Sequence, residues 1–180
     1  IRARQAGIGL AVDAEEADRL DLNVDVFAAV FCDPALANWE GLGVVVQTYL
    51  KRARALVDWL ADLATSQSRR IMVRLVKGAY WDSEIKHAQQ LGLKHYPVFT
   101  RKHHTDVCYL ACTKAVLARP DAFYPQFATH NARTVAAVME LAGESRDYEF
   151  QRLHGMGEAL FGHVLAEEQP APPCRVYAPV

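Results

Sequence analysis

Two cations stand three positions apart in the stretch "RLVKGAYWDSE", residues 74 to 84. Arg74 lies within an apolar run, and Lys77 follows at its end. Burying a positive charge costs free energy unless the charge is paired or used. The two cations could bind an anionic group or stabilise negative charge that develops during a reaction. Two other interpretations stay open. Arg74 could pair with a carboxylate such as Asp13 while Lys77 is a solvated loop lysine, or Lys77 could form an imine with a carbonyl substrate.

Polar residues also close the other apolar runs of the chain. They are Asp13, Gln47, the triplet Thr129, His130 and Asn131, then His154 after Leu153, and Tyr177. The triplet comes directly before a helical pattern, and a helix N-terminus suits a phosphate or a ribose hydroxyl. His130 could equally be a helix cap. A metal site would need His130, His154 and Asp13 to converge, and no metal-binding spacing supports that, so we expect no metal.

The composition is that of one globular domain. The chain has 180 residues, of which 51% are hydrophobic and 23% charged, and its net charge is −1. That charge does not support DNA binding, and no run is long and apolar enough to span a bilayer. The four cysteines form no C-x-x-C pair, which predicts reduced thiols in a cytoplasmic protein. Because the chain opens on Ile1 and stops at Val180 within an apolar run, we expect a piece of a longer protein.

Six short apolar runs alternate with helical patterns. The expected strands are 7–13, 43–47, 71–76, 124–130, 148–154 and 174–180. The expected helices are 14–31, 49–64, a short one between Asp82 as N-cap and Gly92 as terminator, 105–118, 132–142, and one ending near 166. Strict alternation of this kind predicts a parallel sheet with helical crossovers.

Two architectures fit this alternation, an open doubly wound sheet and a (β/α)₈ TIM-type barrel. No G-x-G-x-x-G follows the first strand, which disfavours a nucleotide fold. Each predicted strand carries a polar residue at or beside its C-terminal end, where barrel enzymes build their active sites. A barrel needs eight strands and typically about 250 residues. We therefore expect an α/β barrel that is incomplete here, with about six β-α units.

Several motifs resemble one family. Five of them stand in the family's order: "IMVRLVKGAYWDSEIKHAQ", "YPVFTRKHHTDVCYLA", "YPQFATHNARTVAAV", "YEFQRLHGMGEAL" and "CRVYAPV". "DAEEADRL" and "VVVQTYLKR" fit upstream of them. Together they resemble the proline dehydrogenase domain of the bifunctional proline utilisation A flavoenzymes of bacteria. The resemblance implies that residues 1–180 form part of that domain's distorted (β/α)₈ barrel, without its first two strands and its last helix.

The resemblance also implies a reaction. Such an enzyme would hold FAD at the C-terminal face of the barrel and oxidise L-proline to 1-pyrroline-5-carboxylate by hydride transfer. The electrons would pass to ubiquinone at the membrane, in the first step of proline catabolism to glutamate. The full-length protein would carry a fused aldehyde dehydrogenase domain. It would be cytoplasmic, or peripheral on the cytoplasmic face of the inner membrane.

Roles for single residues follow from the same resemblance. Arg74 would lie beside the reactive flavin nitrogen, and Gln47 would contact the isoalloxazine edge. The flavin and its phosphates would be lined by Val76, Lys77, Gly78, Ala79 and Trp81. The ribose, pyrophosphate and adenine side would be held by Thr129, His130 and Asn131. The proline pocket would be shaped by Asp13, Tyr80, Leu153 and Tyr177, next to Arg74.

Other parts of the family's site would lie outside these 180 residues. They are a lysine and an arginine pair that bind the carboxylate of proline, so we expect the isolated chain to be inactive. Two rival interpretations remain beside the flavoenzyme. One is a Schiff-base aldolase-type barrel that uses Lys77, and the other is an inactive barrel remnant without catalysis.

Overall fold

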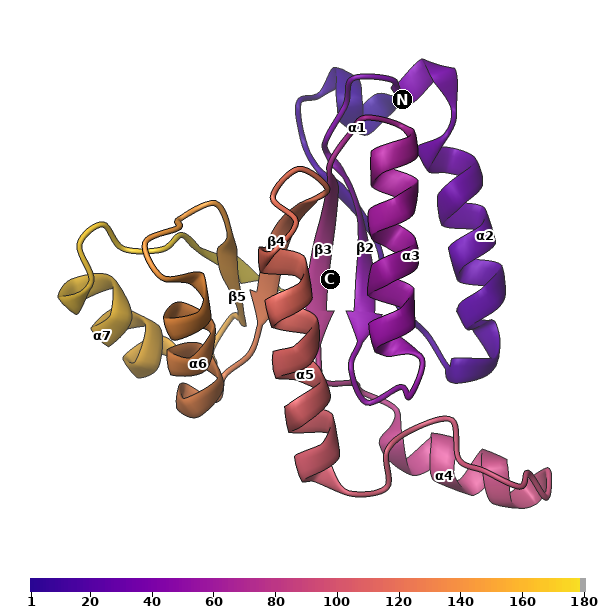
Figure 1. Cartoon of the computed structure of the whole chain (residues 1–180). Coiled ribbons are helices and arrows are strands. Elements are labelled where there is room, and N and C mark those ends of the chain that lie inside the picture. Colours follow the sequence, from indigo (N-terminus) through magenta and orange to yellow (C-terminus); the bar gives the residue numbers. More distant parts are fainter. Residues whose placement is uncertain (179–180) are drawn as a thin grey trace.

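A curled parallel sheet with helices packed on one face organises the chain (Figure 1). The computed structural model describes residues 1–178. Its strands are β1 (Leu10–Val12), β2 (Leu42–Gln47), β3 (Ile71–Val76), β4 (Phe123–Ala128), β5 (Glu149–Leu153) and β6 (Cys174–Tyr177). Its α-helices are α1 (Arg2–Gln5), α2 (Leu20–Phe31), α3 (Ala53–Ser66), α4 (Trp81–Gln90), α5 (Lys102–Leu117), α6 (Ala132–Ala142) and α7 (Glu158–Glu167). Two short 3₁₀ helices are η1 (Ala17–Arg19) and η2 (Pro34–Leu36). Among the helices within residues 1–178, none has the length and apolar character that crossing a membrane requires.

The strands lie in sequence order, and each neighbouring pair is parallel. The contacts of Arg74 in β3 demonstrate the curl, because they reach both edges of the sheet. Its guanidinium lies near Asp13, which follows β1, and near Tyr177 in β6. Strands are spaced about 4.8 Å apart, so a flat sheet would hold β6 about 14 Å from β3. The predicted parallel sheet and incomplete barrel are therefore confirmed.

The hydrophobic core lies between the convex face of the sheet and the helices. Side chains of a strand alternate between the two faces. In β3, Ile71, Val73 and Leu75 are fully buried in the core, whereas the residues between them are only partly buried. Helices α3 and α5 lie beside β2, β3 and β4 (Figure 1) and contribute buried side chains to the same core. Arg74, which alternates with these core residues along β3, therefore lies on the opposite, concave face.

Helix α3 begins later than the sequence predicts. Its start was expected at Tyr49, but the helix begins at Ala53. The intervening backbone bonds to the end of β3 instead: Thr48 N donates to Val76 O at 2.8 Å, and Tyr49 N donates to Lys77 O at 2.7 Å. These bonds extend the sheet past β2 and fix the segment that follows β3.

Other element boundaries also differ from the prediction. Asp82 is not the N-cap of α4, because the helix already begins at Trp81, and the capping position, Tyr80, makes no side-chain cap. Gly92 does follow the helix in the left-handed conformation, with φ of +61°, as its role as terminator requires. The predicted strand 7–13 is reduced to β1, and the helix predicted over 14–31 is divided into η1 and α2. The last predicted strand ends at Tyr177, and residues 179–180 lie outside the described residues.

Candidate active site

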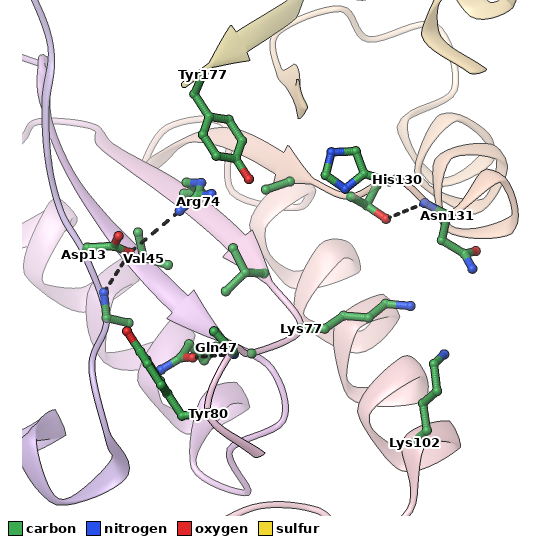
Figure 2. Close-up of a pocket in the computed structure, with 16 residues that line it drawn as sticks. Asp13, Val45, Gln47, Arg74, Lys77, Tyr80, Lys102, His130, Asn131 and Tyr177 are labelled. Carbon is green, nitrogen blue, oxygen red and sulfur yellow. Dashed lines mark hydrogen bonds and ion pairs between the residues drawn. The ribbon is translucent and has the colours of Figure 1, made fainter. Parts of the chain in front are cut away.

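A cavity of about 570 Å³ opens on the concave side of the sheet, at the carboxyl ends of the strands (Figure 2). Its lining comes from β2, β3, β4, β6, the start of α5 and the segments that follow β1, β3 and β4. This volume lies within the roughly 300–1,000 Å³ that is typical of small-molecule sites. The carboxyl end is also where barrel enzymes place their catalytic residues. The cavity is therefore the candidate active site.

Arg74 presents a fixed cation to this cavity (Figure 2). Its side chain is 17% exposed, and Nη1 lies 3.7 Å from Oδ1 of Asp13. The guanidinium carbon lies 4.9 Å from the centre of the Tyr177 ring, within the range of a cation–π contact. Asp13 itself is 74% exposed, so this ion pair orients Arg74 more than it stabilises the fold. The pairing of Arg74 with Asp13 that the sequence left open is confirmed.

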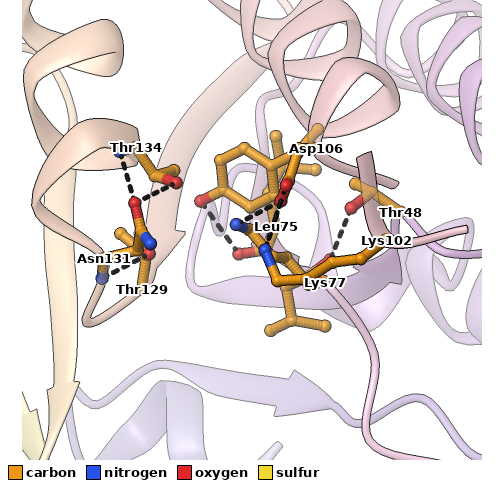
Figure 3. A network of polar contacts seen from close by, with 10 residues as sticks. Thr48, Leu75, Lys77, Lys102, Asp106, Thr129, Asn131 and Thr134 are labelled. Carbon is orange, nitrogen blue, oxygen red and sulfur yellow. Dashed lines mark hydrogen bonds and ion pairs between the residues drawn. The ribbon is translucent and has the colours of Figure 1, made fainter. Parts of the chain in front are cut away.

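Lys77 is not a solvated loop lysine (Figure 3). Its Nζ donates to Oδ1 of Asp106 at 2.5 Å, and Nζ of Lys102 donates to the other oxygen of that carboxylate at 3.0 Å. Burial works to raise the pKa of Asp106, but the hydrogen bonds from the two lysines outweigh it, and the pKa lies below its usual value. Two cations around one carboxylate leave a net positive charge at the cavity wall.

The turn from Thr129 to Asn131 begins α6 (Figure 3). Asn131 is the N-cap, since its side-chain oxygen accepts from Thr134 N at 3.0 Å, so a helix-cap role for His130 is wrong. Thr129 Oγ1 accepts from Asn131 N at 3.2 Å. His130 Nε2 accepts instead from Leu153 N at 2.9 Å. A neutral imidazole that accepts at Nε2 carries its proton on Nδ1, which is therefore the ring's donor.

Gln47 joins the segments that follow β1 and β3. It is 3% exposed, and its Nε2 donates to Glu15 O at 2.7 Å while its Oε1 accepts from Ala79 N at 3.2 Å. The hydroxyl of Tyr80 reaches the same segment, 3.4 Å from Oε2 of Glu15. The negative charge of Glu15 raises the pKa of Tyr80. Both ends of the Gln47 amide are used within the chain, so Gln47 forms part of the wall.

The cavity brings together all but two of the predicted site residues. Those that line it are Asp13, Gln47, Arg74, Val76, Lys77, Gly78, Ala79, Tyr80, Thr129, His130, Asn131 and Tyr177. Trp81 and Leu153 are not part of the lining. Trp81 is 42% exposed and donates from Nε1 to Phe99 O at 2.9 Å, and Leu153 meets the site through its backbone bond to His130.

Sequence reasoning missed four residues of the lining: Ala14, Val45, Lys102 and Ala128. It also missed Asp106, the partner of Lys77. Lys102 and Asp106 are spaced i, i+4, as in an ordinary surface ion pair on a helix, so neither carried a distinctive signal. Within residues 1–178, no three His, Cys, Asp or Glu side chains gather in a way that could hold a metal ion.

A buried carboxylate lies on the concave face in strand register with Arg74. Arg74 pairs with Gln126 in β4, which pairs with Glu149 in β5. Glu149 is 3% exposed and accepts two hydrogen bonds from Arg175, both at 2.8 Å, one from Gln126 at 2.9 Å and one from Gln151 at 2.7 Å. Burial works to raise the pKa of Glu149, but these hydrogen bonds outweigh it, and the pKa lies below its usual value.

Because the pKa of Glu149 is lowered, we expect the protein to lose stability in acid. A carboxyl whose pKa is lowered by folding contributes stability above its unfolded pKa, about 4.3 for glutamate, and the contribution is lost as the pH falls through the lower folded value. We expect Glu149→Gln to lower the free energy of unfolding at pH 7 and to flatten its fall below about pH 4.3. Because the Arg175 side chain is 62% exposed, the loss should stay below the roughly 3–5 kcal/mol of a fully buried pair.

Urea unfolding of the full-length protein at pH 7 and pH 4 measures both effects. Glu158→Gln is the matched control, because Glu158 is an exposed carboxylate, with an ion pair of 3.7 Å to Arg152. If the free energy of unfolding fell between pH 7 and pH 4 as much in Glu149→Gln as in the parent protein, the assignment would be wrong.

Comparison with known proteins identifies the family of the chain. Residues 1–180 match the family model described as proline dehydrogenase. The bifunctional protein PutA of Klebsiella aerogenes is 56% identical over 184 residues, which cover 99% of this chain and 14% of that protein. A crystal structure of a variant of proline utilization A from Bradyrhizobium japonicum superposes with a TM-score of 0.96 at 54% identity, over 99% of this chain and 18% of that one. A crystal structure of proline utilization A from Bdellovibrio bacteriovorus, inactivated by N-propargylglycine, superposes with a TM-score of 0.93 at 34% identity, over 99% of this chain and 19% of that one.

The family model covers the whole sequence, and the solved structures share the curled sheet of this chain. The chain spans only a small part of the length of the PutA proteins that it matches. Within that part, the match extends over 99% of this chain. The chain belongs to the proline dehydrogenase family.

Proposed function

We propose that these residues form the proline-oxidising centre of an FAD-dependent proline dehydrogenase. The protein converts L-proline to 1-pyrroline-5-carboxylate and passes the electrons to ubiquinone at the membrane, as the first step of proline catabolism to glutamate. The family match supports the reaction, and the single observation that carries the proposal is the position of Arg74. It is a partly buried cation in the cavity wall, fixed between Asp13 and Tyr177.

The residues of the cavity fit FAD as its cofactor. Arg74 and the Lys77–Asp106–Lys102 cluster supply positive charge for a cofactor that carries two phosphates. The N-terminus of α6 lies at the other side of the lining and suits anionic and hydroxyl groups. We propose that Val76, Lys77, Gly78 and Ala79 contact the flavin and its phosphates, and that Thr129, His130 and Asn131 contact the ribose and adenine side. Trp81 and Leu153 lie outside the lining and are proposed to act only through their neighbours.

Bound FAD would supply the group that accepts the hydride from the carbon beside the proline nitrogen. The chain's own residues orient the reactants and supply the charge. Arg74 places a positive charge where negative charge develops, and Asp13 and Tyr177 hold it there. Tyr80, which is anchored to Glu15, and Tyr177 supply ring surfaces for the proline ring. The lysine and arginine pair expected to bind the proline carboxylate would come from outside these 180 residues.

Relatives that are called bifunctional support a proposal about the parts of the protein outside these 180 residues. We propose that the full-length protein carries a fused aldehyde dehydrogenase domain and works in the cytoplasm or on the cytoplasmic face of the inner membrane. The Schiff-base alternative is not favoured, because the ammonium of Lys77 is held against Asp106 on α5.

A direct test uses the full-length protein after purification. We expect flavin absorbance, proline-dependent reduction of an artificial electron acceptor, and inactivation by N-propargylglycine, the compound that inactivates the Bdellovibrio relative. Protein without flavin, or flavin that proline does not reduce, would refute the proposal. Borohydride trapping of a substrate on Lys77 would establish the aldolase-type alternative instead.

His130 is predicted to serve the affinity for FAD more than the hydride transfer. Its ring is fixed by Leu153, which leaves Nδ1–H as a donor beside the N-terminus of α6. His130→Ala should weaken FAD retention about tenfold, the effect of one lost hydrogen bond to a charged or polar ligand group, and leave the flavin-loaded enzyme within a fewfold of normal. Equilibrium dialysis of FAD and single-turnover reduction by proline measure the two effects. Normal FAD affinity with a collapsed single-turnover rate would mean that His130 is an acid–base residue.

A further inference from the structure

Glu84 is a buried carboxylate in the first turn of α4. It is 4% exposed, and within residues 1–178 no Lys, Arg or His nitrogen lies within ion-pair distance of it. Burying a carboxylate without a cation is costly unless hydrogen bonds satisfy it. Asp82, two positions earlier in the same turn, is exposed. The helix N-terminus favours an acid at either position, so it does not account for the burial of Glu84.

The carboxylate of Glu84 accepts a hydrogen bond from a distant part of the chain. Its Oε1 lies 2.6 Å from the backbone N of Ala17, the first residue of η1. The residue before η1, Glu16, provides no side-chain cap of its own. The first N–H groups of a helix need an acceptor, and a carboxylate is a strong one. Glu84 therefore caps η1 from another helix and joins α4 to the segment that follows β1.

That segment lines the candidate active site. It carries Asp13, which lies beside Arg74, and Glu15, whose backbone oxygen accepts from Gln47 and whose carboxylate meets Tyr80. Tyr80 directly precedes α4, so Glu84 and Tyr80 reach the same segment from one helix end. The Glu84–Ala17 bond and the Gln47–Glu15 bond thus hold the segment at two points.

We infer that Glu84 is a positioning residue for the substrate pocket. Its hydrogen bond to Ala17 holds the segment 13–17 against α4, so that Asp13 and Tyr80 keep their places in the cavity wall. The inference rests on the proposed function, because it takes Asp13 and Tyr80 to shape the pocket for proline. What matters is the acceptor oxygen, which a glutamine at this position also offers, and not the negative charge.

Three variants of the full-length protein test the inference. We expect Glu84→Ala to raise the KM for proline about tenfold, the effect of losing one hydrogen bond, with kcat changed less than about threefold. Glu84→Gln should restore a KM within about twofold of the parent, because its amide oxygen can accept from Ala17. Asp82→Ala, from the same turn, is the matched control and should leave KM unchanged. FAD content per protein should be equal in all of them.

A readout that does not depend on turnover is amide hydrogen exchange at Ala17. Protection of this amide should fall in Glu84→Ala and persist in Glu84→Gln and Asp82→Ala. Ala17→Pro removes the donor from the other side, at the first position of a helix, where proline is tolerated. In a double-mutant cycle, Glu84→Ala should add little to the KM of Ala17→Pro, because both remove one bond.

The outcomes separate this inference from the proposed function. A parent protein that does not oxidise proline would refute the function. An active parent with an unchanged KM in Glu84→Ala, or with additive effects in the cycle, would refute the positioning role alone. A Glu84→Gln variant as impaired as Glu84→Ala would show that the charge is required and would also overturn it. If Glu84→Ala does not fold, Ala17→Pro decides the matter by its KM, and Glu84→Gln decides it by its KM and by amide exchange at Ala17.

Discussion

Replacing Arg74 by methionine in the flavin-loaded full-length protein is expected to lower proline turnover by about 100-fold or more. Removing one group that is aimed at developing charge typically costs about 10²–10³ in rate. Methionine keeps an unbranched, flexible side chain and loses the charge. The flavin reduction potential should fall as well, and each tenfold change in the two-electron equilibrium corresponds to about 30 mV. Stopped-flow reduction by proline and spectroelectrochemical titration measure the two quantities.

The control for Arg74 is an arginine of equal exposure outside the cavity. Arg152 in β5 also has a side chain that is 17% exposed, but it pairs with Glu158 and not with Asp13. Arg152→Met should leave the potential unchanged and turnover within a fewfold of the parent. Equal losses in the two variants would mean that Arg74 acts through stability. An unaltered potential and rate in Arg74→Met would remove it from the catalytic centre.

The 180-residue chain expressed by itself is expected to associate and to have no measurable proline:acceptor activity. Within the described residues, β1 and β6 each pair with one neighbour only. Exposed apolar side chains accompany both edges, with Leu10 53% and Val176 46% exposed. Unpaired strand edges of this kind invite pairing with another chain. The groups proposed to bind the proline carboxylate are also outside these residues, and loss of such buried charged contacts costs about 2–5 kcal/mol.

Analytical ultracentrifugation of the chain with excess FAD measures its association, and reduction of an artificial electron acceptor measures its activity. The full-length protein under the same conditions is the reference and should be yellow and active. A monomeric chain whose turnover approaches that of the full-length protein would show that the complete substrate site lies within residues 1–180.

The parts of the fold that follow from local pattern could be predicted. Strand β3 has the predicted bounds, 71–76, because its alternating apolar residues face one helical layer. Helix α6 also has the predicted bounds, and Gly143 follows its last residue as the expected terminator, although the N-cap is Asn131 and not His130. Most of the cavity lining could also be predicted from the polar residues at the strand ends, because parallel strands bring their carboxyl ends together.

Contacts between distant elements could not be predicted from the pattern. Glu84 resembles any acid in the first turn of a helix, and its burial depends on how α4 docks against η1. Lys77 resembles a loop lysine until α5 brings Asp106 to it. Trp81 was assigned to the flavin by resemblance, and its indole N–H donates to Phe99 O. In each case the deciding partner lies on another element, and the spacing of residues along one element carries no information about it.

The reach of Arg74 to both edges of the sheet has a consequence during synthesis. Neighbouring strands and their helices can form from contacts that are short in sequence, whereas Arg74 meets Asp13 and Tyr177 from nearly opposite ends of the described chain. Contacts of such long separation are entropically costly to close and form late. On the ribosome, the segment up to β4 can fold while Tyr177 has not yet emerged. The arginine therefore acquires its full surroundings only after translation has passed β6, so the proposed active site is completed late in synthesis.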